Sequence, residues 1–164
     1  MAAVRSPSSS ELGAGLACRR ATGPEQVAVH LAIREAVFVA EQGIFTGSDL
    51  DAHDADPLTQ HVIGYVGEVP AGAVRLYPVP ARRPGETLWK GDRLAVLAEY
   101  RRTGIGAPLV GYAVRAAAAL GGTRMIAHVQ LANVAFFQRL GWSCEGDPGD
   151  YVGVPHQLMS IPLS

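Results

Sequence analysis

The most constraining feature of the sequence is residues 94–107, LAVLAEYRRTGIGA, where an apolar run meets a loop with two glycines and then a helix-forming segment. Gly104 and Gly106 lack side chains, so a ligand can approach the backbone closely there. The first N–H groups of a helix have no partner within the helix, and the helix dipole adds positive potential. The segment therefore predicts a strand–loop–helix unit that binds an anionic group such as a pyrophosphate.

An ordinary helix start with two incidental glycines is the plain alternative for this loop. A Walker loop is excluded, because no Lys-Ser/Thr pair follows Gly106. A dinucleotide fingerprint needs a third glycine and usually an early strand, whereas this loop follows four predicted strands. Arg101 and Arg102 add positive charge at the rim of the predicted anion site.

Elsewhere the chain alternates apolar runs with helical patterns and breakers. The predicted helices begin near residues 22, 108 and 133 and end before glycines at 43, 121 and 141. The predicted strands are residues 16–21, 59–67, 71–79, 87–97, 124–130, 142–145 and 157–162. This order predicts an α/β fold with mixed α+β character, in which helices flank both faces of one mixed central sheet of six to seven strands.

Length and composition predict one domain over residues 16–164, preceded by a disordered lead-in over residues 1–15. An Ala/Ser/Arg transit peptide is the alternative for that lead-in. The net charge of −1 includes no basic cluster, which argues against nucleic acid as a partner. No apolar run approaches the roughly 20 residues of a membrane span. Cys18 and Cys144 lie far apart, which favours a reduced, cytoplasmic protein.

Arg101-x-x-Gly104-x-Gly106 after an apolar strand resembles motif A of the GNAT acetyltransferases, and Asn133 to Trp142 resembles a second segment of that family, N-x-A-x-Y-x-x-x-G-F. Both motifs stand in the family's order. The resemblance implies the GNAT fold and acetyl-CoA as co-substrate, without a metal. It also implies these cofactor-binding residues: Leu94, Ala95, Val96, Arg101, Arg102, Thr103, Gly104, Ile105, Gly106, Ala107, Asn133 and Phe137.

The N-terminal half, from Arg34 to Phe45 and through the aspartates at 49, 51 and 54, is similar to the ElaA-like branch and to acetyltransferases of bacterial nitrogen-starvation gene clusters. Expected substrate-binding residues are Arg34, Gln42, Asp51, His61 and Arg93. An Arg–carboxylate clamp that holds the following loop is the structural alternative for Arg34, and a salt bridge to Asp92 or Glu99 is the alternative for Arg93. The aspartates lack the glycine and the terminal glutamate of a calcium loop.

Acetyl transfer to an amine requires a base that takes a proton from the amine and hydrogen-bond donors that stabilise the oxyanion. A proton donor for the departing thiolate assists the reaction further. Candidate catalytic residues are Glu41, His128 and His156, and backbone-bonded histidines are the alternative for the last two. The resemblance places the family's usual tyrosine acid at Phe137, which cannot donate a proton. The acid is therefore unassigned by the sequence.

The sequence thus predicts an N-acetyltransferase that moves an acetyl group to a primary amine of a small molecule by direct transfer in a ternary complex. The alternatives are a non-catalytic acyl-CoA sensor or partner subunit and a purely structural interaction domain. A homodimer is common in the family. No nucleic acid and no membrane is expected as a partner.

Overall fold

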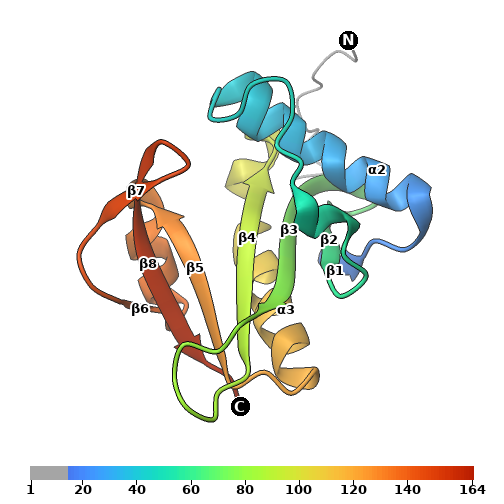
Figure 1. The fold of residues 1–164 in the computed structure, drawn as a ribbon. Helices are drawn as coiled ribbons and strands as arrows, with labels where there is room; N and C mark the ends of the chain where they lie inside the picture. Colours follow the sequence, from blue (N-terminus) through green and yellow to red (C-terminus); the bar gives the residue numbers. More distant parts are fainter. Residues whose placement is uncertain (1–14) are drawn as a thin grey trace.

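The computed structural model describes residues 15–164, which form one mixed sheet with helices on both faces (Figure 1). The predicted lead-in therefore lies, apart from Gly15, outside the described residues. The sheet order is β1-β2-β3-β4-β5-β8-β6, and β7 pairs with β8. The strands are β1 Leu16–Arg20, β2 Gln60–Val66, β3 Val69–Val79, β4 Leu88–Val96, β5 Arg124–Gln130, β6 Ser143–Cys144, β7 Gly149–Tyr151 and β8 Val154–Pro162.

Helical segments connect these strands. They are α2 Gly23–Arg34, the π-helix η1 Glu35–Glu41, the 3-10 helices η2 Ala52–Ala55, η3 Ala98–Thr103 and η4 Leu131–Asn133, and the α-helices α3 Gly106–Ala119 and α4 Val134–Arg139. No helix among residues 15–164 is long and apolar enough to cross a membrane.

The two faces of the sheet carry separate apolar cores. On one face, Ile33, Val37 and Phe38 pack with residues of β2, β3 and β4. On the other, α3 packs on β2 and β3 (Figure 1). A Cβ at Gly64 would lie 2.8 Å from Ile105 Cγ1, and one at Gly72 would lie 2.7 Å from Leu109 Cδ1. These two glycines therefore allow the start of α3 to sit directly against the sheet, which positions the loop before it.

All strand pairs are antiparallel except β4–β5, which is parallel and short. It extends only from Leu88↔Arg124 to Lys90↔Ile126. Beyond Lys90 the strands diverge, as Figure 1 shows between the yellow-green and orange arrows. A β-bulge in β4 lies just past this point, because Arg75 pairs with Asp92 and Ala73 with Ala95. Arg93, in the bulge, has φ +52, an uncommon value for a residue other than glycine.

The mixed sheet and the main helices agree with the sequence prediction, whereas several local details differ. The predicted single helix after Thr22 changes to a π-helix at Glu35, because its last turns are wider than the 3.6-residue period that a sequence pattern reveals. The loop at 98–107 contains η3, and α3 starts at Gly106 rather than Pro108. Strand β7 was not expected, since Gly146 to Gly153 is rich in turn-forming residues.

Candidate active site

The loop between β4 and α3 has the backbone that an anion site needs. Gly104 has φ +80 at the end of η3, a left-handed conformation that L side chains rarely adopt. No side chain caps the first turn of α3. Its N–H groups and the positive end of the helix dipole therefore remain available for a negatively charged group. The local geometry agrees with the predicted pyrophosphate loop.

A groove follows this loop along the end of β4. Its lining includes eight of the predicted cofactor residues: Leu94, Ala95, Val96, Arg101, Gly104, Gly106, Ala107 and Asn133. Gln42, predicted for the substrate, also lines this groove, and its Oε1 accepts a hydrogen bond of 3.2 Å from Gln130 Nε2. The contact joins the end of η1 to the end of β5 across the groove.

The remaining predicted cofactor residues do not line this groove. Ile105 is fully buried in the core beneath the loop. Thr103 supports the loop, since its hydroxyl donates to the carbonyl of Tyr100 at 2.5 Å. Arg102 is exposed beside the groove. Phe137 instead lines a second cavity.

The second cavity occupies the space where β4 and β5 diverge; we call it the fork cavity. It shares the lining residues Leu94, Gln130 and Asn133 with the groove, so the two lie side by side. Its walls are mainly apolar and aromatic. Its lining comprises Phe38, Ile44, Phe45, Val74, Gly91, Asp92, Arg93, Leu94, Val110, Ala113, Ala127, His128, Val129, Gln130, Asn133, Phe137, Trp142, Tyr151, Val152 and His156.

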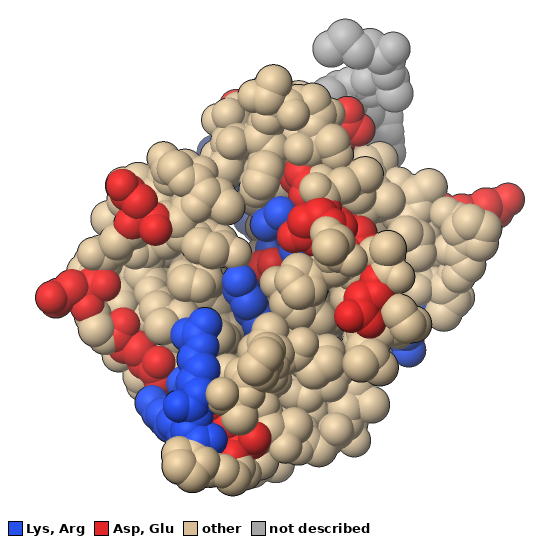
Figure 2. Space-filling view, viewed as in Figure 1, with Lys and Arg blue, Asp and Glu red and all other residues tan. Residues whose placement is uncertain are grey.

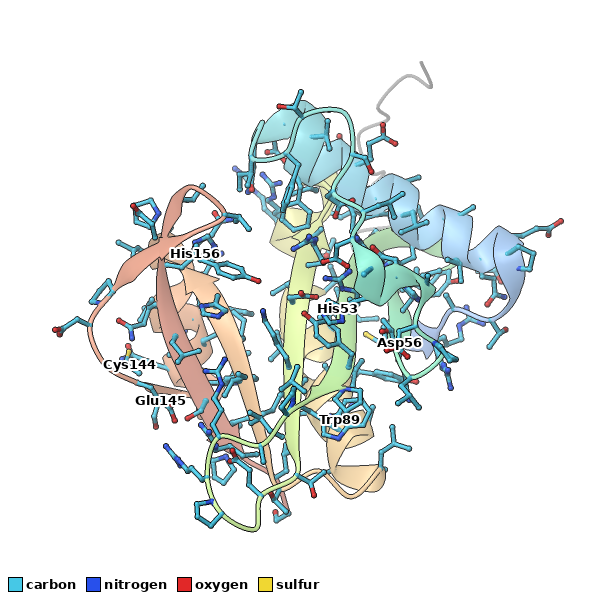
Figure 3. All side chains as sticks on the ribbon, viewed as in Figure 1. His53, Asp56, Trp89, Cys144, Glu145 and His156 are labelled. Atoms are coloured by element: carbon cyan, nitrogen blue, oxygen red, sulfur yellow. The ribbon has the colours of Figure 1, made fainter. Side chains whose placement is uncertain are left out.

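An aromatic cluster forms the β5–β8 side of the fork cavity. The rings of His128 and Tyr151 stack with centroids 4.0 Å apart, and His156 meets Tyr151 edge-on at 5.5 Å. Lys90 Nζ donates a hydrogen bond of 2.8 Å to Tyr151 Oη. Figure 3 shows His156 on this side of the sheet and His53, which stacks on Tyr77 at 3.8 Å, on the β3–β4 side.

The two candidate histidines of this cluster differ in their surroundings. Burial, together with the charge of Lys90, lowers the pKa of His128 to about 4, so this imidazole is neutral at pH 7. His156 is buried, and its Nδ1 lies 2.7 Å from the carbonyl oxygen of Val154. A hydrogen on Nδ1 satisfies that carbonyl and leaves Nε2 as an acceptor.

Glu41, the third candidate catalytic residue, lines neither the groove nor the fork cavity. Arg101 donates hydrogen bonds to both carboxylate oxygens of Glu41, and the bond from Nη1 to Oε2 is 2.6 Å long. This hydrogen bonding lowers the pKa of Glu41. The pair joins the end of η1 to the loop between β4 and α3.

Arg34, Asp51 and His61 belong to a buried ionic network under the η2 loop. Arg34 is fully buried and binds Asp49 Oδ2 and Asp54 Oδ1, each at 2.7 Å. His61 Nε2 lies 2.9 Å from the same Asp54 oxygen. Burial alone would raise the pKa of Asp54, but the hydrogen bonds from His61 and Arg34 outweigh it and hold that pKa well below its usual range.

A second buried arginine completes the network. Arg75 binds Asp92 at 2.7 Å and Asp51 at 2.7 Å. Arg93 joins it through Asp49, with Nε 3.2 Å from Oδ2, and lies over the ring of Phe45 at 4.5 Å. Neither Asp92 nor Glu99 is its ion-pair partner among the described contacts. On the face of the molecule that Figure 2 draws, basic side chains extend from the centre toward the lower left, with acidic side chains beside them.

Sequence reasoning missed Tyr151 and Lys90. Tyr151 lies in a turn-rich segment with no periodicity, and Lys90 lies in a strand where a lone lysine predicts an exposed position. Only the pairing of β7 with β8, and of β4 with β5, brings the two together.

Comparisons with known proteins agree with this geometry. A model of the acetyltransferase (GNAT) family matches residues 30–142. A candidate acetyltransferase of Bacillus subtilis strain 168 is 29% identical over 143 residues, covering 87% of this chain and 93% of its own. The crystal structure of a candidate N-acetyltransferase from Lactobacillus plantarum superposes with a TM-score of 0.77 at 25% identity, covering 91% of this chain and 99% of its own.

Escherichia coli ElaA has the same fold, with a TM-score of 0.74 at 19% identity over 89% of this chain and 99% of its own. The family model spans more than half of the described residues, including the loop at Gly104 and the segment from Asn133 to Trp142. The resemblance read from the two motifs is thereby confirmed. The chain belongs to the GNAT acetyltransferase family and is an acyl-CoA-dependent N-acyltransferase.

Proposed function

We propose that the protein transfers the acetyl group of acetyl-CoA to a primary amine of a small molecule by direct transfer in a ternary complex. The observation that supports this most is that the groove and the fork cavity lie side by side and share Leu94, Gln130 and Asn133. The pyrophosphate would bind at the loop of Gly104, and the pantetheine arm would follow β4 into the fork. The acceptor would enter from the side of the aromatic cluster.

The positions of the cysteines support direct transfer. The chain has two cysteines, Cys18 and Cys144, and neither lines the groove or the fork cavity. Cys144 lies in β6 at the outer edge of β8, away from β4 (Figure 3). No thiol is therefore placed to carry the acetyl group between the two substrates.

His156 is our choice for the base. Its Nδ1–H is held by the Val154 carbonyl, so Nε2 can accept a proton from the attacking amine. A neutral His128 would help to orient the acceptor, and a backbone N–H of β4 near Ala95 would meet the oxyanion, as a preorganised donor does in other acyl transfers. Arg93, at the wall of the cavity, would contact an anionic group on the acceptor.

The test is thiol release from acetyl-CoA across a panel of primary amines, namely amino acids, diamines and aromatic amines. Turnover with intersecting double-reciprocal lines supports direct transfer, and parallel lines would indicate an acetyl-enzyme. Phe137 motivates the second candidate, a non-catalytic acyl-CoA sensor. Thermal stabilisation by coenzyme A without turnover across the panel would favour that sensor.

We further propose a cytoplasmic location, on the basis of the two unpaired cysteines. A homodimer is also proposed, and light scattering of the purified protein tests it directly.

A further inference from the structure

The breakdown of the tetrahedral intermediate expels a thiolate, and a nearby proton donor lowers the free energy of that step. Phe137 lines the fork cavity and has no proton to give. A side chain that protonates the sulfur in its place has to line the same cavity.

Few described residues of the cavity can supply this proton. Asp92 is held as an anion by Arg75, at 2.8 Å and 2.7 Å, and also accepts from Tyr77 Oη at 2.9 Å. His128 is neutral, because its pKa is lowered to about 4. The Nδ1 hydrogen of His156 is bound to the Val154 carbonyl. The lining includes one phenolic hydroxyl, that of Tyr151.

From these contacts we infer that Tyr151, delivered by the β7–β8 hairpin, protonates the departing thiolate, and that Lys90 positions its hydroxyl. The inference rests on the proposed function. Tyr151 lines the same cavity as Phe137 but lies in β7, whereas Phe137 lies in α4. At the family's usual donor position this chain has Phe137, which cannot donate a proton. The phenolic hydroxyl of the cavity belongs to Tyr151 in β7.

The contact with Lys90 explains how the phenol of Tyr151 can donate a proton in this cavity. It is the last residue of β4 that pairs with β5, so its side chain rises at the point where the fork opens. Its ammonium donates to Tyr151 Oη at 2.8 Å and has no carboxylate ion-pair partner among the described residues. A positive charge at this distance stabilises the phenolate that remains after proton transfer.

The stacked ring of His128 fixes the position of the phenol. Stacking at 4.0 Å, with 9° between the ring planes, restricts Tyr151 to one side of the cavity. Removal of the hydroxyl alone keeps this packing, so Tyr151→Phe is expected to fold as the wild type does.

The chemical step balances. The acceptor nitrogen forms a bond to the carbonyl carbon of the thioester, and the nitrogen gives its proton to Nε2 of His156. The carbon–sulfur bond then breaks with its electron pair on sulfur, and the phenolic proton of Tyr151 moves to that sulfur. The products are the amide and the free thiol. The proton held by His156 returns to the phenolate through solvent, which restores both groups.

The experiment compares Tyr151→Phe with Tyr65→Phe, using acetyl-CoA and the best amine of the panel. Tyr65 lies in β2, outside both cavities, and its ring contacts Arg19. We expect kcat of Tyr151→Phe to fall about tenfold or more, with the KM of acetyl-CoA and the stabilisation by coenzyme A unchanged. The solvent deuterium isotope effect on kcat should fall toward one. Tyr65→Phe should match the wild type.

Lys90→Met provides a second variant, in which the phenol remains but loses its charged partner. We expect kcat to fall in the same direction by a smaller factor, with the KM of acetyl-CoA again unchanged. Wild-type turnover with Tyr151→Phe within twofold of it would overturn this assignment and leave the proposed function standing. A wild type that binds coenzyme A but turns over no amine would contradict both.

Discussion

Arg101, in the loop between β4 and α3, donates two hydrogen bonds to Glu41 at the end of η1, one of them 2.6 Å long. Its Nε also donates to the Val96 carbonyl at 3.2 Å. The ion pair connects the N-terminal π-helix to the end of β4. It also engages the guanidinium of Arg101, the arginine in the described lining of the groove. Glu41 and an incoming phosphate therefore compete for the same arginine.

We expect Glu41→Gln to tighten coenzyme A binding by a few-fold, because the change removes a negative charge beside the phosphates and frees Arg101. The kcat should change by less than about threefold, since hydrogen bonding to Arg101 lowers the pKa of Glu41 and makes it a weak base. Calorimetry with coenzyme A and steady-state kinetics measure the two effects. A loss of kcat of about a hundredfold would instead identify Glu41 as the base.

Gly104→Val should abolish measurable coenzyme A binding. The backbone at φ +80 resists a β-branched residue, and the new side chain would project toward the groove. No protein atom lies within 4 Å of the added Cβ, so the fold should survive.

Gly85→Val is the matched control, because Gly85 has φ +74, has equally open surroundings and does not line the groove. Both variants should lose a similar stability, about 1–2 kcal/mol. Only Gly104→Val should lose calorimetric binding. Equal binding by the two variants would contradict the assignment of the loop.

Arg34→Met should destabilise the protein by about 3–5 kcal/mol, because it leaves Asp49 and Asp54 as buried charges without their main partner. Urea unfolding measures this loss. Arg19→Met, in the edge strand β1, should cost less than about 1 kcal/mol. A small loss for Arg34→Met, accompanied by a large rise in the KM of the acceptor, would favour the predicted role of Arg34 in substrate binding.

Stability should fall as the pH drops from about 6.5 toward 3. His30 is fully buried, and its desolvation lowers its pKa to about 3. The unfolded chain, with a histidine pKa near 6.5, therefore binds the proton first, and the folded state loses relative stability below that pH. The contribution of His30 at pH 5 is about 2 kcal/mol.

Urea unfolding at pH 7 and pH 5 tests this linkage. His30→Gln keeps a donor for the Val62 carbonyl but does not titrate. The difference in unfolding free energy between the two pH values should therefore be about 2 kcal/mol smaller in this variant than in the wild type. An identical pH dependence in both proteins would show that His30 is not the group responsible.

The part of the site that the sequence predicted is local in the chain. The pyrophosphate loop depends on the left-handed backbone at Gly104 and on a helix start two residues later. Both properties belong to a few consecutive residues, so their pattern is visible without the fold. The second segment, beginning at Asn133, is local for the same reason. The mixed sheet was predictable because each strand and helix has its own apolar periodicity.

The buried network was only partly predictable. The sequence predicted that Arg34 and Asp51 bind the substrate, and a carboxylate clamp was the structural alternative for Arg34. In the structure, Asp49, Asp51 and Asp54 contact Arg34 or Arg75. Arg75 itself went unnoticed, because an arginine in an apolar strand reveals neither its burial nor its partners.

The sequence by itself determined the family, the cofactor loop and the absence of an acid at Phe137. The tertiary structure alone decided which side chains meet in the fork cavity. Lys90 and Tyr151 are 61 residues apart, and their 2.8 Å contact exists because β4 and β5 separate after three residue pairs while β7 folds back onto β8. Such a contact depends on where distant strands pair and where they stop pairing. Strand pairing is a property of the whole sheet, and no local pattern of residues encodes it.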